Sequence, residues 1–406
     1  MNWSFFSLIV SQTSTNLSFA LYTMAIIMYF YNETGLATIS TTITLISVIS
    51  RMISSFVLPI ISDKFHSLTL IRFSQLIQLV FLSTLLFLLY LNPFSIKIMI
   101  LTLVLMSIIS FFNGWFSPIK SSLVGLLVLK DNRVKANSLL TTVDQMFMFA
   151  GWTLGGLLLT ILGKEFILFI SIMLLILSLA SLGLIRLNNK GHIPTPEGIL
   201  KRITLGWKTL FLNKELKVLI TMDAIEGLVG TIWIGAITLT FVKEALNEGE
   251  QWWGYINGVY FLGMILGGLL IYRISHLLKK DIKYYMIIGS CLFGVLTTIY
   301  GFLENPILVL FLVLFMGPVN QVRDTLQETI FQNSTDAQTL TKVLAAKTAI
   351  IQLIFIISLI IISILTDLIG VRLVYVLSGV LLISSSIYGL FHFTSLKRKL
   401  IIKSLN

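Results

Sequence analysis

The sequence is short of charge, cysteine and histidine. Charged residues make up 12% of the 406-residue chain, about half of what a soluble globular domain carries. Its one cysteine, Cys291, excludes an intramolecular disulfide and a cysteine-rich metal site. The four histidines lie far apart in the sequence, without the spacing of metal ligands. This composition excludes an ordinary soluble protein, a disordered chain and a typical nucleic-acid binder.

Motifs for nucleotide binding and hydrolysis are also missing. No Gly-x-x-x-x-Gly-Lys-Ser/Thr run is present, so we do not expect ATP as the energy source. No His-Glu-x-x-His or Gly-x-Ser-x-Gly motif suggests an enzyme, and we expect neither a cofactor nor a bound metal. The first apolar run starts at once, without a basic segment before it or a small-residue cleavage site after it, so we expect no cleavable signal.

Long apolar runs dominate what is present, since hydrophobic residues make up 56% of the chain. A bilayer-spanning helix needs about 20 apolar residues. Twelve runs fit, at 4–30, 39–61, 68–91, 97–118, 138–161, 165–186, 218–242, 252–273, 283–303, 307–329, 342–365 and 370–392. They do not alternate as barrel strands would. The sequence therefore predicts an all-α membrane protein with twelve transmembrane helices.

The one long connection lies at the middle of the chain. It divides the sequence into an N-terminal six-helix bundle (1–186), a cytoplasmic linker (187–217) and a C-terminal six-helix bundle with a short basic tail (218–406). In the linker, Thr195 and Pro196 are typical of a helix start. An apolar face then follows, so the segment is either an amphipathic helix at the membrane surface or an ordinary linker helix.

Basic residues indicate the orientation. The formal net charge is +11, but lysine and arginine are scattered through short loops without forming a basic stripe. With both termini in the cytoplasm, 22 basic residues fall in inner segments and 4 in outer segments. We therefore expect a multi-pass protein of a bacterial-type cell membrane with both ends inside. Its partners would be the lipid bilayer and a small molecule rather than nucleic acid.

The two halves echo each other. Pro118 closes the expected fourth span and Pro318 lies in the tenth, which is fourth in its half. Six plus six helices around a central cytoplasmic loop is the layout of a two-lobed transporter whose site lies between the lobes.

Several segments then carry a resemblance to a known family. They are Tyr31-Asn32-Glu33-Thr34-Gly35 after the first span, and Pro59-Ile60-Ile61-Ser62-Asp63-Lys64 at the end of the second. With these the chain resembles the major facilitator superfamily, and within it the macrolide and multidrug exporters. Asp63 and Lys64 match the family's Asp-Arg loop motif in kind, so the resemblance implies a gating role for them. It also implies a functional monomer with pseudo-symmetric halves that rock around a central site.

The fifth span resembles the glycine-rich motif of exporters. Gly151 and Gly155 match it, whereas Trp152 stands where the family has proline. The resemblance implies a gating role for both glycines, and we add Asp144 near the cytoplasmic end of the same span. Many drug–proton antiporters carry a basic residue in the fourth span. Here Ser110 stands at that place, and the nearest basic residue is Arg51 in the second span.

Charged residues inside the spans mark the candidate site. One such side chain at the bilayer centre costs roughly 2.5–3.5 kcal/mol, so it faces a partner or a wet cavity. Asp223 and Glu226 share a helix face, as do Asp324 and Glu328. We expect these four acids to carry the coupling proton, although an ion pair of the first two with Arg323 or Lys347 is the structural alternative.

Polar residues on the spans expected around the cavity complete the site. The candidates for the substrate cavity are Gln12, Asn16, Arg51, Asn113, Asn257, Asn320 and Arg323. Arg323 directly precedes Asp324 on the same helix, so its side chain should point about 100° away from that of Asp324. Arg51 has no acid one helical turn away on its own helix, so it needs a partner elsewhere, a wet cavity or the substrate.

The sequence favours a proton-coupled exporter of small molecules. A close alternative is an exporter of a zwitterionic or anionic metallophore, because Arg51 and Arg323 suit substrate carboxylates. Another is a membrane sensor or enzyme that transports nothing. The helix layout alone does not give the direction of transport.

Overall fold

The computed structural model describes residues 3–34, 37–91, 94–186, 199–233, 235–249 and 251–393. Within these ranges all regular elements are helical, which confirms the prediction of an all-α chain. The α-helices are α1 (Trp3–Thr34), α2 (Ala37–Ser62), α3 (Ser67–Leu91), α4 (Ile96–Asn113), α5 (Phe116–Leu127), α6 (Arg133–Gly183), α7 (Ile199–Leu212), α8 (Lys214–Gly227), α9 (Gly235–Thr240), α10 (Gln251–Leu278), α11 (Ile282–Phe302), α12 (Pro306–Asn333), α13 (Ala337–Ile369) and α14 (Val371–His392). Short 3₁₀ or π turns are η1 (Lys130–Asn132), η2 (Gly230–Trp233) and η3 (Phe241–Ala245).

Among the described residues, nine helical segments are long and apolar enough to cross a membrane. The other three expected spans correspond to α1, to the first part of α6 and to the run from α8 to η3. The expected fifth and sixth spans form the single element α6, which breaks at Gly163. Gly163 has a φ of 79°, a left-handed conformation that glycine adopts at little cost.

Several helix starts follow directly from the local sequence. The Asn305 side chain accepts hydrogen bonds from the backbone N–H groups of Ile307 and Leu308, and Pro306 occupies the first turn of α12. Asn213 caps α8 in the same way, and Ser95 caps α4 by accepting from Ile98. These caps satisfy backbone donors that a helix start otherwise leaves unpaired.

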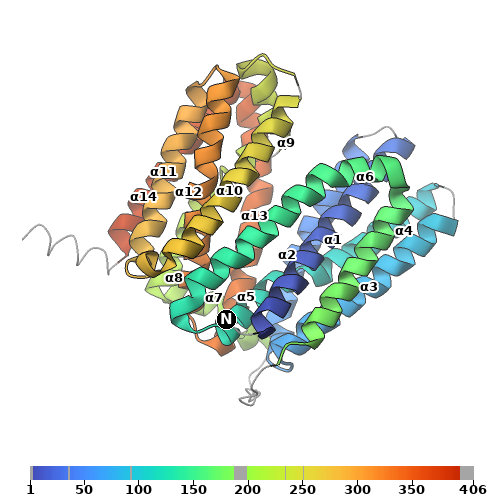
Figure 1. Cartoon of the computed structure of the whole chain (residues 1–406). Coiled ribbons are helices and arrows are strands. Elements are labelled where there is room, and N and C mark those ends of the chain that lie inside the picture. The colour runs from blue at the N-terminus through green and yellow to red at the C-terminus, as the bar shows by residue number, and fades with distance from the viewer. Residues whose placement is uncertain are drawn as a thin grey trace, which may run out of the picture. The chain divides into compact units, whose positions relative to one another are not determined.

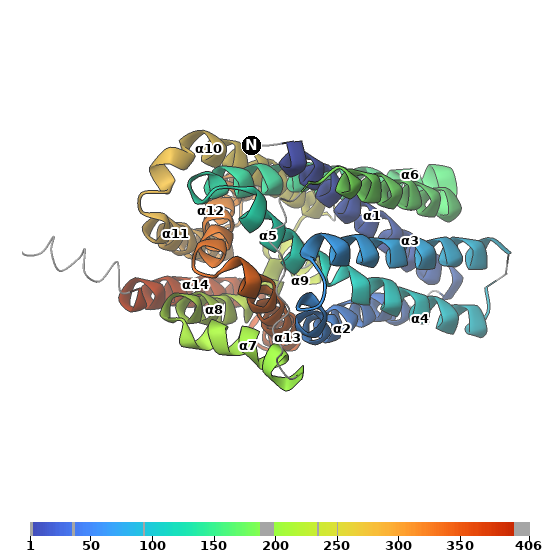
Figure 2. The same ribbon diagram turned by 90° about the horizontal axis from the view of Figure 1, so that it is seen from below.

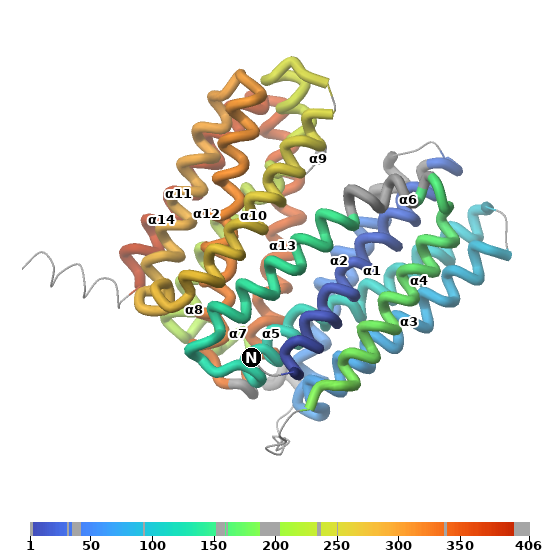
Figure 3. Tube along the Cα trace, in the orientation of Figure 1, coloured from blue at the N-terminus to red at the C-terminus, as the bar shows by residue number. Residues whose placement is uncertain are grey.

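The chain forms two compact units. Unit 1 holds residues 1–129, 146–207 and 337–352, and unit 2 holds residues 130–145, 208–336 and 353–406. Unit 1 therefore includes the start of α13 from late in the sequence, and unit 2 includes the start of α6. In unit 1, α3 lies along α4 (Figures 1 and 2), and α1 lies beside α2 (Figure 3).

Apolar side chains from α1, α3, α4 and the second part of α6 fill the core of unit 1. Tyr22, Leu85, Met106 and Leu168 are fully buried there. Unit 2 packs α10 on α12, and α11 on both α12 and α14. A Cβ added to Gly263 of α10 would lie 3.2 Å from Gly317 Cα of α12. Such small residues let membrane helices approach closely.

The expected seventh span is not continuous. Helix α8 ends at Gly227, and η2, α9 and η3 follow as short pieces. The Tyr375 hydroxyl donates to the Ile232 carbonyl at 2.8 Å, which pairs a backbone acceptor that the break leaves open. Tyr300, Tyr375 and Phe241 pack around this break, so aromatic side chains support an irregular segment at membrane depth.

The linker helix α7 packs against the protein in unit 1. Trp207 stacks on Phe56 with ring centroids 5.8 Å apart. Gly206 lies against the backbone of Lys342, where a side chain would clash. Thr195 and Pro196, the expected start of the helix, lie outside the described residues.

Candidate functional site

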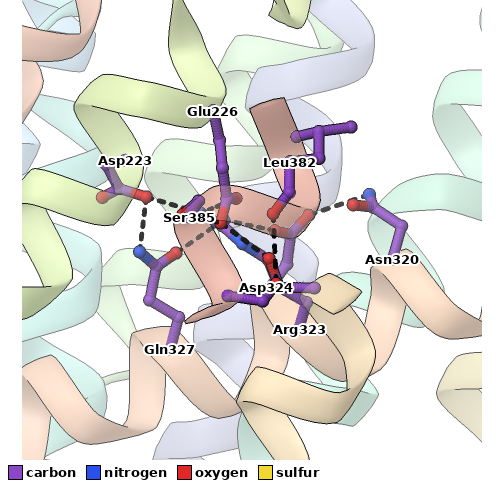
Figure 4. Close-up of polar contacts among 10 residues, drawn as sticks. Asp223, Glu226, Asn320, Arg323, Asp324, Gln327, Leu382 and Ser385 are labelled. Atoms are coloured by element: carbon purple, nitrogen blue, oxygen red, sulfur yellow. Dashed lines mark hydrogen bonds and ion pairs between the residues drawn. The ribbon is translucent and has the colours of Figure 1, made fainter. Parts of the chain in front are cut away.

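The densest polar cluster of unit 2 joins α8 to α12 through one guanidinium. Arg323 Nη2 lies 2.7 Å from Asp223 Oδ1 and 2.6 Å from Glu226 Oε2. Its Nη1 lies 2.8 Å from Asp324 Oδ1. Figure 4 shows the three acids converging on Arg323 from two helices. One basic side chain therefore pairs with three acids.

The cluster corrects the expected direction of Arg323. Residues one position apart on a helix point about 100° from each other, and Arg323 was expected to point away from Asp324. Its long side chain instead curves back, so Nη1 pairs with Asp324 and donates to Gln327 Oε1 at 2.7 Å. The length of the arginine side chain overrides the direction that its Cα–Cβ bond sets.

Neutral donors complete the shell of the acids. Ser290 of α11 and Ser385 of α14 donate to Glu226 Oε1 at 2.7 and 2.8 Å. Gln327 Nε2 donates to Asp223 Oδ1 at 2.5 Å. Sequence reasoning missed both serines, because a single serine in an apolar helix carries no signal of its own. The four helices α8, α11, α12 and α14 thus meet at the Glu226 carboxyl.

Among the ion pairs that Arg323 makes, acids outnumber the one base. With all acids ionised, Asp223, Glu226 and Asp324 carry three negative charges against the one positive charge of Arg323. The Asp223, Glu226 and Arg323 side chains are only 6%, 12% and 14% exposed, whereas Asp324 is 42% exposed. Low-dielectric surroundings strengthen the repulsion between like charges. The arrangement therefore has the chemistry to take up a proton or a cation.

Three other predicted residues of the second half take different positions. Asn320 donates to Asp324 Oδ2 at 3.2 Å, so it belongs to the cluster. Asn257 donates to the Trp253 carbonyl of its own helix at 2.8 Å. Glu328 lies one turn beyond Asp324 on α12 and is half-buried. The structure therefore brings Asn320 to the acids but ties the Asn257 amide to α10.

Unit 1 holds the predicted cavity residues of the first half. Arg51 of α2 is half-buried, and its guanidinium lies 5.1 Å from the centroid of the Phe19 ring. Gln12 is 2% exposed, and its Oε1 has no hydrogen-bond partner among the described residues. Asn16 is half-buried on α1. Asn113 donates to Gln78 Oε1 of α3 at 3.3 Å.

A second buried ion pair lies in unit 1. Asp63 Oδ1 at the end of α2 lies 2.5 Å from Lys342 Nζ at the start of α13, with side chains only 9% and 4% exposed. The sequence also favours a basic residue at the start of the fifth span as a partner of Asp63, and this stays a prediction. Arg133, which lies before that span, donates to the Gln332 carbonyl at 2.6 Å in unit 2. Lys64 is exposed.

Burial has an electrostatic consequence at Arg133. It lowers the pKa of the Arg133 guanidinium from its ordinary value. Next along α6, Asn137 donates to Thr329 Oγ1 and to Gln332 Oε1, each at 2.9 Å. These bonds tie the start of α6 to the end of α12 inside unit 2.

The remaining gating candidates lie on α6. Asp144 is half-buried in the part of α6 that belongs to unit 2. Gly151 faces α1, where an added Cβ would lie 2.6 Å from Leu17 Cδ1. The surroundings of Gly155 lie outside the side chains that the structure describes. Among the described residues, no group of three or more His, Cys, Asp or Glu side chains is placed to hold a metal ion.

Comparisons with known proteins agree with this architecture. A family model described as Major Facilitator Superfamily matches residues 5–321. The uncharacterized MFS-type transporter YfmI of Bacillus subtilis (strain 168) is 45% identical over 393 residues, which cover 96% of this chain and 96% of that protein.

Solved structures show the same fold. A bacterial homologue of the iron transporter ferroportin, in an outward-facing state, superposes with a TM-score of 0.78 at 13% identity, covering 97% of this chain and 99% of that one. The E. coli fucose:proton symporter FucP superposes with a TM-score of 0.75 at 12% identity, again covering 97% and 99%. At such low identity the likeness concerns the fold alone.

Proposed function

Because the chain belongs to the major facilitator superfamily, and is therefore a multi-pass membrane transporter of small molecules rather than an enzyme, we propose that it is a proton-coupled exporter. Transporters of this family need no cofactor. The energy source in this proposal is the proton gradient, and the mechanism is alternating access, in which the substrate site opens to one side of the membrane at a time.

The observation that carries the proposal is the excess of acid around Arg323. Three carboxyls share one guanidinium, and two of them are almost fully buried in a membrane-spanning region. Like charges held this close favour a state in which one carboxyl holds a proton. Buried carboxyls with such neighbours are typical of proton relays in transporters.

Each acid has its own part in this proposal. Glu226 is the main proton carrier, since it is buried and two serine hydroxyls already hold one of its oxygens. Asp223 and Asp324 keep Arg323 paired when Glu226 is neutral. Glu328, one turn further along α12, is a possible next acceptor. Loss of the proton returns the full attraction to Arg323, so protonation biases one conformational state and deprotonation the other.

Transport in proteoliposomes tests the coupling. The double variant Asp223→Asn, Glu226→Gln is expected to lose transport driven by a pH gradient while retaining exchange of labelled for unlabelled substrate. The matched control is Asp367→Asn near the end of α13, an exposed acid outside the cluster, which should transport normally. Gradient-driven transport that persists in the double variant removes the coupling role.

Two substrate classes fit the proposal. The multidrug branch that the sequence resembles favours a lipophilic cation, which the negative charge around Arg323 suits. A zwitterionic or anionic metallophore is the second candidate, because Arg51 forms no ion pair among the described residues. A comparison of metabolites retained by cells with and without the protein separates the two by the charge of the retained compound.

The expected membrane topology and domain bounds are part of the same proposal. It places six spans in residues 1–186, a cytoplasmic linker at 187–217, six spans in 218–406, both termini inside, and a functional monomer. Cysteine labelling tests the orientation in a Cys291→Ser background. Glu248→Cys should react with an impermeant reagent added outside intact cells, whereas Lys190→Cys should be protected. The reverse pattern contradicts the proposed orientation.

A further inference from the structure

The surroundings of Arg51 in unit 1 are unusual for a buried basic side chain. Its guanidinium lies over the Phe19 ring, 5.1 Å from the centroid. Among the described residues no acidic side chain pairs with it, and its Nε–H is buried without an acceptor. A ring face attracts a cation but accepts no conventional hydrogen bond. The positive charge is therefore held in place while its donors remain available.

Two more donors lie on the same helix faces. Tyr22 is three residues after Phe19 on α1, with ring centroids 5.5 Å apart. Ser54 is three residues after Arg51 on α2, and residues at that spacing share a helix face. Both side chains are fully buried, and neither hydroxyl has a hydrogen-bond partner among the described residues.

Gly114 at the end of α4 packs directly against Ser54. At Gly114, where α4 ends, an added Cβ would lie 2.8 Å from Ser54 Oγ and 3.1 Å from Arg51 Cα. Any side chain larger than hydrogen would therefore press on the two polar residues. The next residue, Trp115, is 2% exposed and its indole N–H also has no acceptor in the described part of the chain.

All of these groups can donate a hydrogen bond. The Arg51 guanidinium donates only, and the Tyr22 and Ser54 hydroxyls each have a proton to donate. A buried donor without an acceptor costs free energy, so the unliganded face is an unfavourable arrangement. A carboxylate offers two oxygens with about four acceptor sites and a negative charge, and arginine matches it bidentately. A cation offers neither the acceptor oxygens nor the negative charge.

We propose that Arg51 and Tyr22 form a subsite for a carboxylate group of the transported molecule. This inference rests on the proposed function and narrows it, because it makes the substrate an organic anion or zwitterion rather than a purely cationic drug. The Phe19 ring gives the subsite an apolar wall, which suits a carboxylate attached to an aromatic ring.

Binding of radiolabelled salicylate to the purified full-length protein in detergent tests this subsite. The wild-type protein is expected to bind salicylate, and unlabelled salicylate should compete. Salicylamide, which has the same ring without the negative charge, and tetraphenylphosphonium, a lipophilic cation, should not compete. Failure of the wild type to bind salicylate, or equal competition by salicylamide, overturns the proposal.

Variants assign the effect to the named donors. Arg51→Gln should abolish binding, and Arg51→Lys should weaken it about tenfold because lysine cannot form the bidentate contact. Tyr22→Phe should also weaken binding about tenfold, the usual effect of losing a hydrogen bond to a charged group. Because the Tyr22 hydroxyl has no hydrogen-bond partner among the described residues, this variant should fold and melt like the wild type.

The matched control is Arg72→Gln on α3 of the same unit. Arg72 Nη2 donates to the Leu182 carbonyl at 2.6 Å, so its donors are already used. This variant should bind salicylate as the wild type does. Unchanged binding in Tyr22→Phe, or equal losses in Arg51→Gln and Arg72→Gln, contradicts the subsite. Gradient-driven export by a wild type that does not bind salicylate would refute this inference alone. Absence of gradient-driven export would refute the proposed function instead.

Discussion

Two arginines inside apolar helices have opposite surroundings. Arg323 in unit 2 contacts three carboxylates at 2.6 to 2.8 Å. Arg51 in unit 1 contacts an aromatic ring and, among the described residues, no acid. Both residues stand in the sequence as single basic residues within spans. The difference teaches that the partners on other helices, rather than the residue type, decide whether a buried arginine is structural or available to a ligand.

The largest expected effect is a difference in stability between the Arg323→Gln and Arg51→Gln variants. Arg323→Gln removes the guanidinium that pairs with the buried Asp223 and Glu226 carboxylates, and removing one partner of a buried pair costs about 3–5 kcal/mol. Arg51→Gln removes a charge that pairs with no acid among the described residues, so its free energy of unfolding should change by less than about 1 kcal/mol. Melting of both proteins in detergent, followed by size-exclusion chromatography, measures this. Equal losses would break the comparison.

Neutralising the carboxyls together with Arg323 tests whether charge or packing holds this cluster. The triple variant Asp223→Asn, Glu226→Gln, Arg323→Gln keeps the hydrogen-bonding shapes but takes away the charges of the three buried side chains, leaving only the more exposed Asp324. Its yield of folded protein should recover well above that of Arg323→Gln, because the desolvation cost of unpaired carboxylates disappears. Expression and monodispersity are the readouts. A triple variant that folds no better than the single one would show that packing rather than charge holds this cluster.

The buried ion pair of Asp63 and Lys342 gives a second comparison with the acids around Arg323. Both side chains are buried in unit 1, and Asp63 Oδ1 lies 2.5 Å from Lys342 Nζ. Asp63→Asn should lower transport severalfold while the protein still expresses, because Lys342 then loses its partner in the state that the pair stabilises. The charge swap Asp63→Lys, Lys342→Asp should restore part of the activity. Uptake assays check this, and normal transport by Asp63→Asn would remove the pair from gating.

The smallest effect concerns a half-buried pair, Glu215 at the start of α8 and Lys283 at the start of α11. Burial raises the pKa of the Glu215 carboxyl, but hydrogen bonds from Lys283 and Ser334 outweigh it, so the pKa lies below its usual range. A lowered pKa adds stability above the unfolded-state value, and this is lost as pH falls through the folded-state value. Glu215→Gln should therefore cost less than about 1 kcal/mol at pH 7, and the cost should shrink as the pH is lowered. Melting over a series of pH values measures the difference, and a cost that does not change with pH would contradict the electrostatic cause.

The sequence predicted much of the fold, because the cost of leaving backbone groups unpaired in lipid permits few structures. Apolar runs of about 20 residues indicated the helices. The break in the expected seventh span was missed, although Gly227, Gly230 and Gly235 cluster there. Those glycines are the local signal that a continuous helix would end.

The site was harder to predict than the fold. The cost of intramembrane charge singled out Asp223, Glu226 and Asp324 from the sequence. It did not give the reach of Arg323 back to its neighbour, nor the choice of Lys342 as the partner of Asp63. Ser290 and Ser385 carry no charge and no spacing pattern, so only the packing of α11 and α14 on α8 and α12 reveals them.

The account's central claim is that a proton gradient drives export through the acids around Arg323. Inside-out membrane vesicles, acidified inside and supplied with cytosolic extract, test it by untargeted mass spectrometry of the vesicle contents. The wild type should accumulate at least one compound only when the gradient is present, and the Asp223→Asn, Glu226→Gln variant should not accumulate it. Accumulation that is independent of the gradient, or equal in the two proteins, would contradict the claim.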